Sequence, residues 1–121
     1  MNPSKEYKKL INSFKYAIEG FISSFKTERN MKIHILAMII VIALGLYVKL
    51  NVTEWCIITI AIVLVIAGEL FNTAFETVVD MISPEKNSKA KLIKDISAAA
   101  VLVLAIGAAI IGGIIFIPKF M

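Results

Sequence analysis

The sequence predicts an all-α integral membrane protein, with one N-terminal amphipathic helix on the membrane surface and three transmembrane helices. Hydrophobic residues make up 59% of the 121 residues, against about 45–50% in a typical soluble domain, and they concentrate in long unbroken runs. The first thirty residues are instead polar and basic, so no secretory signal is expected there. Because the chain is too short to hold a soluble catalytic domain beside its spans, residues 1–121 are expected to form one membrane domain.

Residues 4–26 are expected to form the surface helix, with Ser4 as its N-cap. Apolar side chains recur in this segment at helical spacing, and lysines fill the opposite face. A basic amphipathic helix rich in Phe and Leu fits a membrane surface, although a helix packed on a protein partner would give the same pattern. The membrane surface is favoured because an apolar span follows directly.

The spans are expected within three helices that cover residues 31–50, 54–82 and 88–117. Thr53 is the expected N-cap of the middle helix, Ser83-Pro84 stops that helix, and Pro118 ends the last one. At 1.5 Å per residue the middle helix is about 43 Å long, which exceeds the hydrocarbon thickness of about 30 Å. Its C-terminal part must therefore leave the hydrocarbon, and that part carries the acidic residues.

The distribution of basic residues predicts the orientation. Eleven of the thirteen Lys and Arg residues lie in the N-terminal segment or in the connection between the second and third spans. The positive-inside rule places both segments in the cytoplasm and places Lys49 and Lys119 on the outer side. Three spans make a thin scaffold for a buried polar site, and small residues at Ala105, Ala109 and Gly113 allow close helix approach. A homo-oligomer is therefore expected.

The stretch GELFNTAFETVVD at residues 68–80 carries the strongest functional signal. At 100° per residue, Glu69, Asn72, Glu76 and Asp80 fall within about 80° of one another on one helix face. By helix rise, Glu69 lies just inside the inner edge of the hydrocarbon, and Glu76 lies at headgroup level. An ionisable group at the bilayer centre costs about 2.5–3.5 kcal/mol on insertion scales, so its presence indicates a function.

These residues, with two further charged groups, supply the parts that phosphoryl transfer needs. Glu28 and Glu76 offer two carboxylates for Mg²⁺, which binds one or two carboxylates together with phosphate oxygens and water. Lys94, beside Asp95 on the next helix, can neutralise phosphate charge. Glu69 can accept the proton of an attacking hydroxyl.

Other interpretations fit less of the sequence. Asp80 and Glu85 also fit an ordinary solvated helix terminus. An oligomeric ion or proton pathway with Glu69 as its relay would explain the buried carboxylate, but not Lys94 and Asp95. The sequence has no phosphate-binding glycine loop, and His34 is its one histidine, too few for a zinc site. His34 is expected to bond between helices or contact a lipid headgroup, and nucleic-acid binding is not expected.

The motif E-x-x-N-[ST]-A-x-E-x-x-x-D at residues 69–80, followed by AKLIKDISAAAVL at residues 90–102, resembles the prokaryotic diacylglycerol kinase family. The segments ERNMKIH at 28–34, EW at 54–55 and IIFIPK at 114–119 resemble its Gram-positive branch, the undecaprenol kinases. The resemblance implies a homotrimer in the bacterial plasma membrane, with active sites shared between subunits. It also implies ATP-dependent phosphorylation of a lipid alcohol, with undecaprenol favoured and diacylglycerol as the alternative.

The resemblance also implies roles for individual residues. Glu69 matches the family's catalytic base, and Glu28 and Glu76 match the carboxylates that hold Mg²⁺ against ATP. Further positions match the nucleotide and catalytic site, namely Tyr16, Asn72, Glu85, Lys86, Asn87, Lys94 and Asp95.

Overall fold

The computed structural model describes residues 2–121, and almost all of them are helical, with no strand among them. The elements are α1 (Pro3–Thr27), α2 (Arg29–Val48), α3 (Val52–Ile82), α4 (Ser88–Phe116) and a short 3₁₀ helix η1 (Ile117–Phe120). Their bounds differ from the sequence-based ranges by no more than one or two residues. Helices α2, α3 and α4 with η1 are long and apolar enough to cross a membrane.

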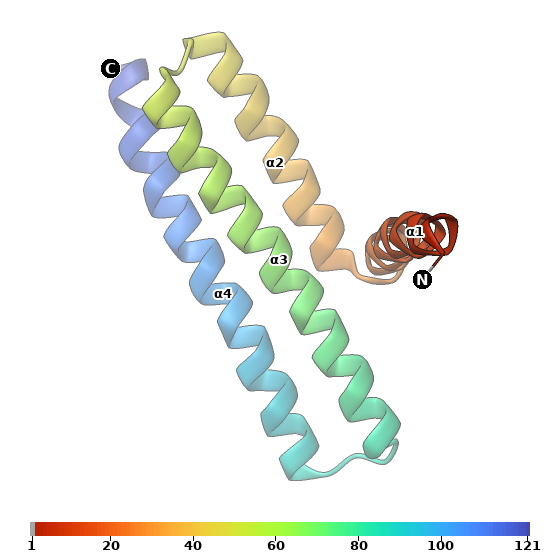
Figure 1. The fold of residues 1–121 in the computed structure, drawn as a ribbon. Coiled ribbons are helices and arrows are strands. Elements are labelled where there is room, and N and C mark those ends of the chain that lie inside the picture. The colour runs from red at the N-terminus through yellow and green to blue at the C-terminus, as the bar shows by residue number, and fades with distance from the viewer. Residues whose placement is uncertain (1) are drawn as a thin grey trace.

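Helix α3 is the centre of the fold. It packs along α4 in an antiparallel pair and also contacts α2 and α1 (Figure 1). Figure 1 shows α2 beside the N-terminal part of α3 only, so the C-terminal part of α3 and the start of α4 extend beyond it. In Figure 1 helix α1 is seen almost end-on beside the N-terminal end of α2, so it runs crosswise to the other three helices. The C-terminus lies at the other end of the bundle, near the α2–α3 turn.

Asparagine side chains cap three of the helices. Asn2 accepts from the backbone N–H of Ser4 at 3.0 Å, and Asn87 accepts from that of Ala90 at 2.8 Å. At the start of α3, Asn51 and Glu54 form a reciprocal capping box. The sequence-based N-caps Ser4 and Thr53 were therefore wrong: an asparagine stands two residues before each of them, and its side-chain oxygen caps the helix in their place.

The described residues bury little apolar surface within one chain. Most large apolar side chains of the three long helices are exposed. Seven apolar residues are buried, namely Met31, Leu50, Ile58, Ala61, Val65, Val79 and Val101. Apolar patches of this extent are rare on soluble monomers. The exposed surface therefore agrees with a chain whose long helices face lipid or other apolar partners.

One close approach of helices depends on a glycine. A Cβ at Gly45 would lie 2.6 Å from Cη2 of Trp55 and 2.9 Å from Cδ1 of Leu50. The indole ring of Trp55 therefore packs directly on the α2 backbone, at the end of the bundle where the α2–α3 turn lies.

The substitution Gly45→Ala is expected to destabilise the protein. Overpacking at this contact should cost about 1–3 kcal/mol, more than the roughly 0.5–1 kcal/mol that Ala gains over Gly within a helix. The control is Gly20→Ala, because no atom lies within 4 Å of a Cβ at that position. Thermal unfolding in detergent should show a lower midpoint for Gly45→Ala only. Equal midpoints for both variants would contradict this packing.

Candidate active site

Glu69 is the most enclosed ionisable residue among those described. It lies on α3, its exposed fraction is 0%, and neither of its carboxylate oxygens has a hydrogen-bond partner within residues 2–121. A buried polar group without a partner costs about 1–3 kcal/mol, and more when it is charged. A carboxylate kept in this state is a candidate for catalysis, because its free lone pairs can accept a proton.

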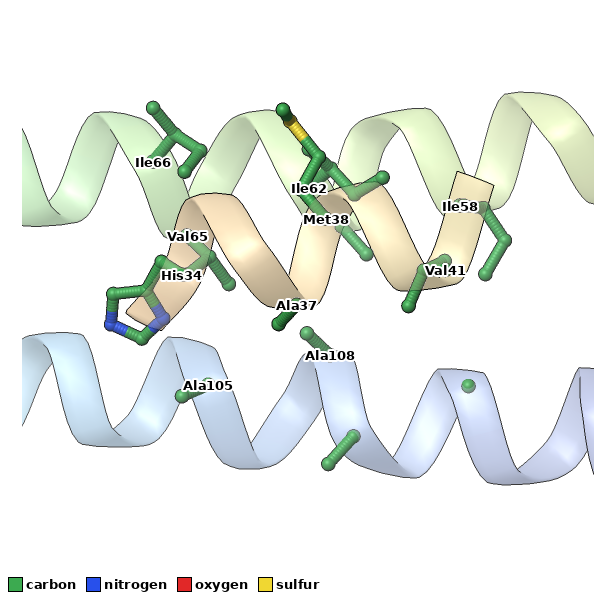
Figure 2. A pocket seen from close by; sticks show the side chains of 13 residues that line it. His34, Ala37, Met38, Val41, Ile58, Ile62, Val65, Ile66, Ala105 and Ala108 are labelled. Atoms are coloured by element: carbon green, nitrogen blue, oxygen red, sulfur yellow. The ribbon is translucent and has the colours of Figure 1, made fainter. Parts of the chain in front are cut away.

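His34 on α2 is the nearest cationic or imidazole group to Glu69. Its Nε2 lies 3.7 Å from Oε2 of Glu69, and its side chain is 18% exposed. Figure 2 shows the imidazole at one end of an apolar cavity of about 280 Å³ between α2, α3 and α4, with Val41 and Ile58 toward the other end. Small residues of α4, among them Ala105 and Ala108, line the side of this cavity opposite α3.

Asn72 and Glu76 continue the same face of α3 toward the α3–α4 turn. Asn72 is buried, and its Nδ2 donates to Oε1 of Glu76 at 3.4 Å. Its side-chain oxygen has no partner within residues 2–121. Glu76 is half-buried. This face therefore presents three unpartnered oxygen atoms of Glu69 and Asn72 beside the more open carboxylate of Glu76.

Glu28 lies at the single non-helical residue between α1 and α2. Burial raises the pKa of its carboxyl above the ordinary value, and the nearby carboxylates of Glu76 and Glu69 raise it further. Glu28, Glu69 and Glu76 are therefore close enough to interact, although Glu28 comes from the α1–α2 junction and the other two from α3. We call Glu28, Glu69, Asn72 and Glu76 the acidic cluster.

The acidic cluster fits a divalent cation that also binds phosphate. Within residues 2–121, no three Asp, Glu, His or Cys side chains form a ready-made metal site. Burial and the nearby carboxylate of Glu76 instead raise the pKa of the Glu28 carboxyl, and a cation shared by the two acids would relieve their repulsion. Two carboxylates completed by phosphate oxygens and water are the ligands that Mg²⁺ prefers.

A chain of hydroxyl groups joins α1 to the backbone of Glu69. The hydroxyl of Thr73 donates to the carbonyl oxygen of Glu69 at 3.1 Å. Oγ of Ser24, which is buried on α1, lies 3.1 Å from Oγ1 of Thr73. Since the Thr73 proton is already used, Ser24 is the donor in this second bond. The contact joins α1 to α3 one helical turn after Glu69.

A second group of charges lies where α3 turns into α4, and we call Asp80, Lys91, Lys94 and Asp95 the turn cluster. Lys94 pairs with Asp80 at 2.5 Å, and Lys91 pairs with Asp95 at 2.6 Å. A cavity of about 540 Å³ lies among these four residues and the loop residues Glu85, Lys86 and Asn87. Asp80 follows Glu76 by one helical turn, so the two clusters are adjacent on α3.

The structure thus divides the sequence-predicted site residues between two neighbouring clusters. Lys94 faces Asp80 across the α3–α4 pair, and its ion pair is with that aspartate. Tyr16 is 63% exposed on α1, and none of the side-chain hydrogen bonds among residues 2–121 joins it to either cluster.

Sequence reasoning missed three contributors. His34 was given no part in catalysis, Asp80 was interpreted as a solvated helix end, and Ser24 was not singled out. The signal for Asp80 was its place on the acidic face of α3, one turn after Glu76. An interhelical bond of His34 was one of two expectations, but neither its partner Glu69 nor the contact of Ser24 gave a signal, because both contacts with α3 span more than thirty residues of sequence.

The chain is similar to known proteins over nearly its whole length. The family model described as "Prokaryotic diacylglycerol kinase" matches residues 15–116. The chain is 40% identical over 114 residues to undecaprenol kinase of Bacillus subtilis, covering 94% of this chain and 93% of that protein. It is 36% identical to diacylglycerol kinases of Synechocystis, covering 93% of this chain and 65% of that protein, and of Haemophilus influenzae, covering 88% and 92%.

The substitution Ser24→Ala is expected to loosen α1. It leaves the half-buried hydroxyl of Thr73 without its partner from α1, and loss of such a bond costs about 0.5–1.5 kcal/mol. Amide hydrogen exchange should become faster in α1 while the protected core of α3 stays unchanged. Ser23→Ala is the matched control, because the neighbouring side chain is exposed. Unchanged exchange in Ser24→Ala would show that the bond does not hold α1.

Proposed function

Because this chain belongs to the prokaryotic diacylglycerol kinase family and is a membrane lipid kinase, we propose that it transfers the γ-phosphoryl group of ATP to undecaprenol. The buried, unpartnered carboxylate of Glu69 within the acidic cluster is the observation that carries this proposal. It supplies a proton acceptor at the depth where a membrane lipid presents its hydroxyl. The similarity to an undecaprenol kinase over nearly the whole chain supports the choice of lipid.

In the proposed reaction Glu69 is the general base. The lipid's primary hydroxyl enters beside the carboxylate, and its proton passes to Glu69 as its oxygen forms a bond to the γ-phosphorus. The bond between that phosphorus and the leaving oxygen of ADP then breaks. Because Glu69 is fully buried, water has little access to the base, which favours transfer to the lipid over hydrolysis.

Glu28 and Glu76 would hold Mg²⁺ against the phosphates of ATP. Burial raises the pKa of the Glu28 carboxyl, and the neighbouring carboxylates of Glu76 and Glu69 raise it further; a divalent cation would offset the repulsion between these acids. When bound, Mg²⁺ supplies stabilisation of the negative charge on the transferred group. The unpartnered oxygen of Asn72 lies between the base and Glu76 on the same face, and we assign it to the same site.

We assign the turn cluster and its cavity to the polyphosphate and nucleoside of ATP. Lys94 would neutralise phosphate charge by exchanging Asp80 for a phosphate oxygen, because the Asp80 side chain is 63% exposed and an exposed ion pair contributes little stability. The loop residues Glu85, Lys86 and Asn87, together with Asp95, line the cavity in which a nucleotide would extend. Tyr16 of α1 would contact the nucleotide only where association of subunits brings α1 against a turn cluster.

We further propose that α1 lies on the cytoplasmic surface of the membrane and that the chain forms a trimer. In the structure, Lys49 and Lys119 lie at the end of the bundle where Glu54 pairs with Lys119 at 3.1 Å. The other basic residues lie toward α1 and the α3–α4 turn, which supports a cytoplasmic position for both clusters. The extensive exposed apolar surface of α2 and α4 supports association of copies in the bilayer.

The substitution Glu69→Gln should abolish turnover while the protein stays folded. Loss of a general base typically lowers the rate by about 10²–10⁴-fold. Transfer of labelled phosphate from ATP into extracted lipid measures the activity, and detergent size-exclusion chromatography measures the fold. Glu54→Gln is the control, since that carboxylate lies at the opposite end of the bundle. Near-normal activity of Glu69→Gln would exclude Glu69 as the base.

The substitution Glu76→Gln should lower activity even at saturating Mg²⁺. It removes one of the two proposed metal carboxylates and weakens the hydrogen bond from Asn72, so additional Mg²⁺ cannot restore the arrangement. A titration of activity against Mg²⁺ at fixed ATP checks this, with Glu19→Gln of the exposed α1 face as the control. Full recovery at high Mg²⁺ would place the metal elsewhere.

A panel of lipid alcohols tests the substrate. Undecaprenol, a shorter polyprenol and diacylglycerol all offer a primary hydroxyl, so differences in kcat/KM report recognition of the apolar part. We expect the polyprenols to be phosphorylated fastest. Preference for diacylglycerol would assign the chain to the other activity named among its relatives.

A further inference from the structure

The geometry points to His34 as a positioning residue that holds the carboxylate of Glu69 for proton transfer. This inference rests on the proposed function, in which Glu69 is the base, and adds a residue to which sequence reasoning gave no part in catalysis. His34 would act through Glu69, and it would not itself gain or lose a proton during the reaction.

Within the described residues, no hydrogen-bonding group orients the carboxylate of Glu69. Both carboxylate oxygens lack a hydrogen-bond partner within residues 2–121, and the side chain is fully buried. A general base uses one oxygen to accept the substrate proton, and the other oxygen needs a donor that fixes the orientation of the group. His34 is placed for this role, since its Nε2 lies 3.7 Å from Oε2 of Glu69.

The separation of 3.7 Å is longer than a hydrogen bond, whose donor–acceptor distance is about 2.7–3.2 Å. Catalytic hydrogen bonds are often long in the absence of substrate and shorten in its presence. A movement of less than about 1 Å by either side chain would form the bond, in the tautomer that carries the proton on Nε2. Oε1 of Glu69 then stays free for the hydroxyl of the lipid.

The place of His34 in the apolar cavity strengthens this assignment. Its imidazole lies at one end of a cavity otherwise lined by apolar side chains (Figure 2). In such surroundings water does not compete strongly for the imidazole N–H, so a bond to the carboxylate is favoured. The reaction stays balanced without any change at His34: the lipid proton moves to Glu69, the lipid oxygen bonds to the γ-phosphorus, and ADP leaves.

Three substitutions separate positioning from packing. His34→Leu should lower kcat by about 10–100-fold, the range found when hydrogen-bond partners that orient metal ligands are removed, with little change in KM for ATP. His34→Gln should recover most of the lost kcat, because its amide nitrogen can occupy the position of Nε2. His34→Asn should not recover it, because its shorter amide reaches only the position of Nδ1.

A spectroscopic measurement tests the contact without catalysis. His34 is the single histidine of the chain, so ¹⁵N-histidine labelling gives one imidazole to observe. Glu69→Gln should shift the Nε2 resonance, whereas Glu54→Gln at the far end of the bundle should leave it unchanged. An unmoved resonance would overturn the proposal even where Glu69 proves to be the base, and a shifted resonance with active Glu69→Gln would overturn the proposed function instead.

The kinetic outcomes are equally distinct. Equal kcat for His34→Leu and His34→Gln, or a change confined to KM, would assign His34 to packing alone. If His34→Leu fails to fold, the comparison of His34→Gln with His34→Asn carries the test, because both variants keep a polar side chain at the cavity end. Equal activity of these two would overturn the proposal.

Discussion

The candidate site depends on the burial of one carboxylate, that of Glu69, on the largely apolar helix α3. Glu69 has no exposed surface and no hydrogen-bond partner within residues 2–121, a state that disfavours the folded chain unless the site receives a ligand. The other polar features of the site are arranged around it. Thr73 bonds to its backbone and His34 approaches its side chain. Burial, Glu76 and then Glu69 raise the pKa of the Glu28 carboxyl. In the proposed reaction, this burial in apolar surroundings is what lets Glu69 accept the proton of a lipid hydroxyl.

A gradient of exposure along one face of α3 organises the chemistry. Glu69 is 0% exposed and Asn72 is 4% exposed, Glu76 is half-buried, and the Asp80 side chain is 63% exposed. The eleven residue steps from Glu69 to Asp80 span about 17 Å along the helix axis. In the proposed reaction a lipid hydroxyl would meet the buried end, and phosphates that carry several charges would meet the open end. One helix would then serve both a substrate that avoids water and a substrate that requires it.

Much of this could be predicted from the sequence, because helix periodicity and apolar runs are local signals. The helices, the acidic face of α3 and the pairing of Glu28 with Glu76 follow from them and from the family motif. An interhelical bond of His34 was one of two expectations, but its partner Glu69 and the contact of Ser24 with Thr73 could not be predicted, since they depend on how α2 and α1 pack against α3. Lys94 illustrates the same limit: its position on α4 was clear from sequence, but its partner Asp80 is set by the register of the α3–α4 pair.

The junction between α1 and α2 carries Glu28, one of the proposed metal carboxylates. A single non-helical residue, Glu28, separates the two helices, and Ser24 of α1 contacts Thr73 of α3, one helical turn after Glu69. Because no longer loop separates α1 from α2 in the described residues, a movement of α1 would act directly on the backbone of Glu28. In the proposed reaction Glu28 holds Mg²⁺, so a movement of α1 that admits the lipid would also disturb the binding of the cation. The junction would then couple access to the site with the metal that the reaction needs.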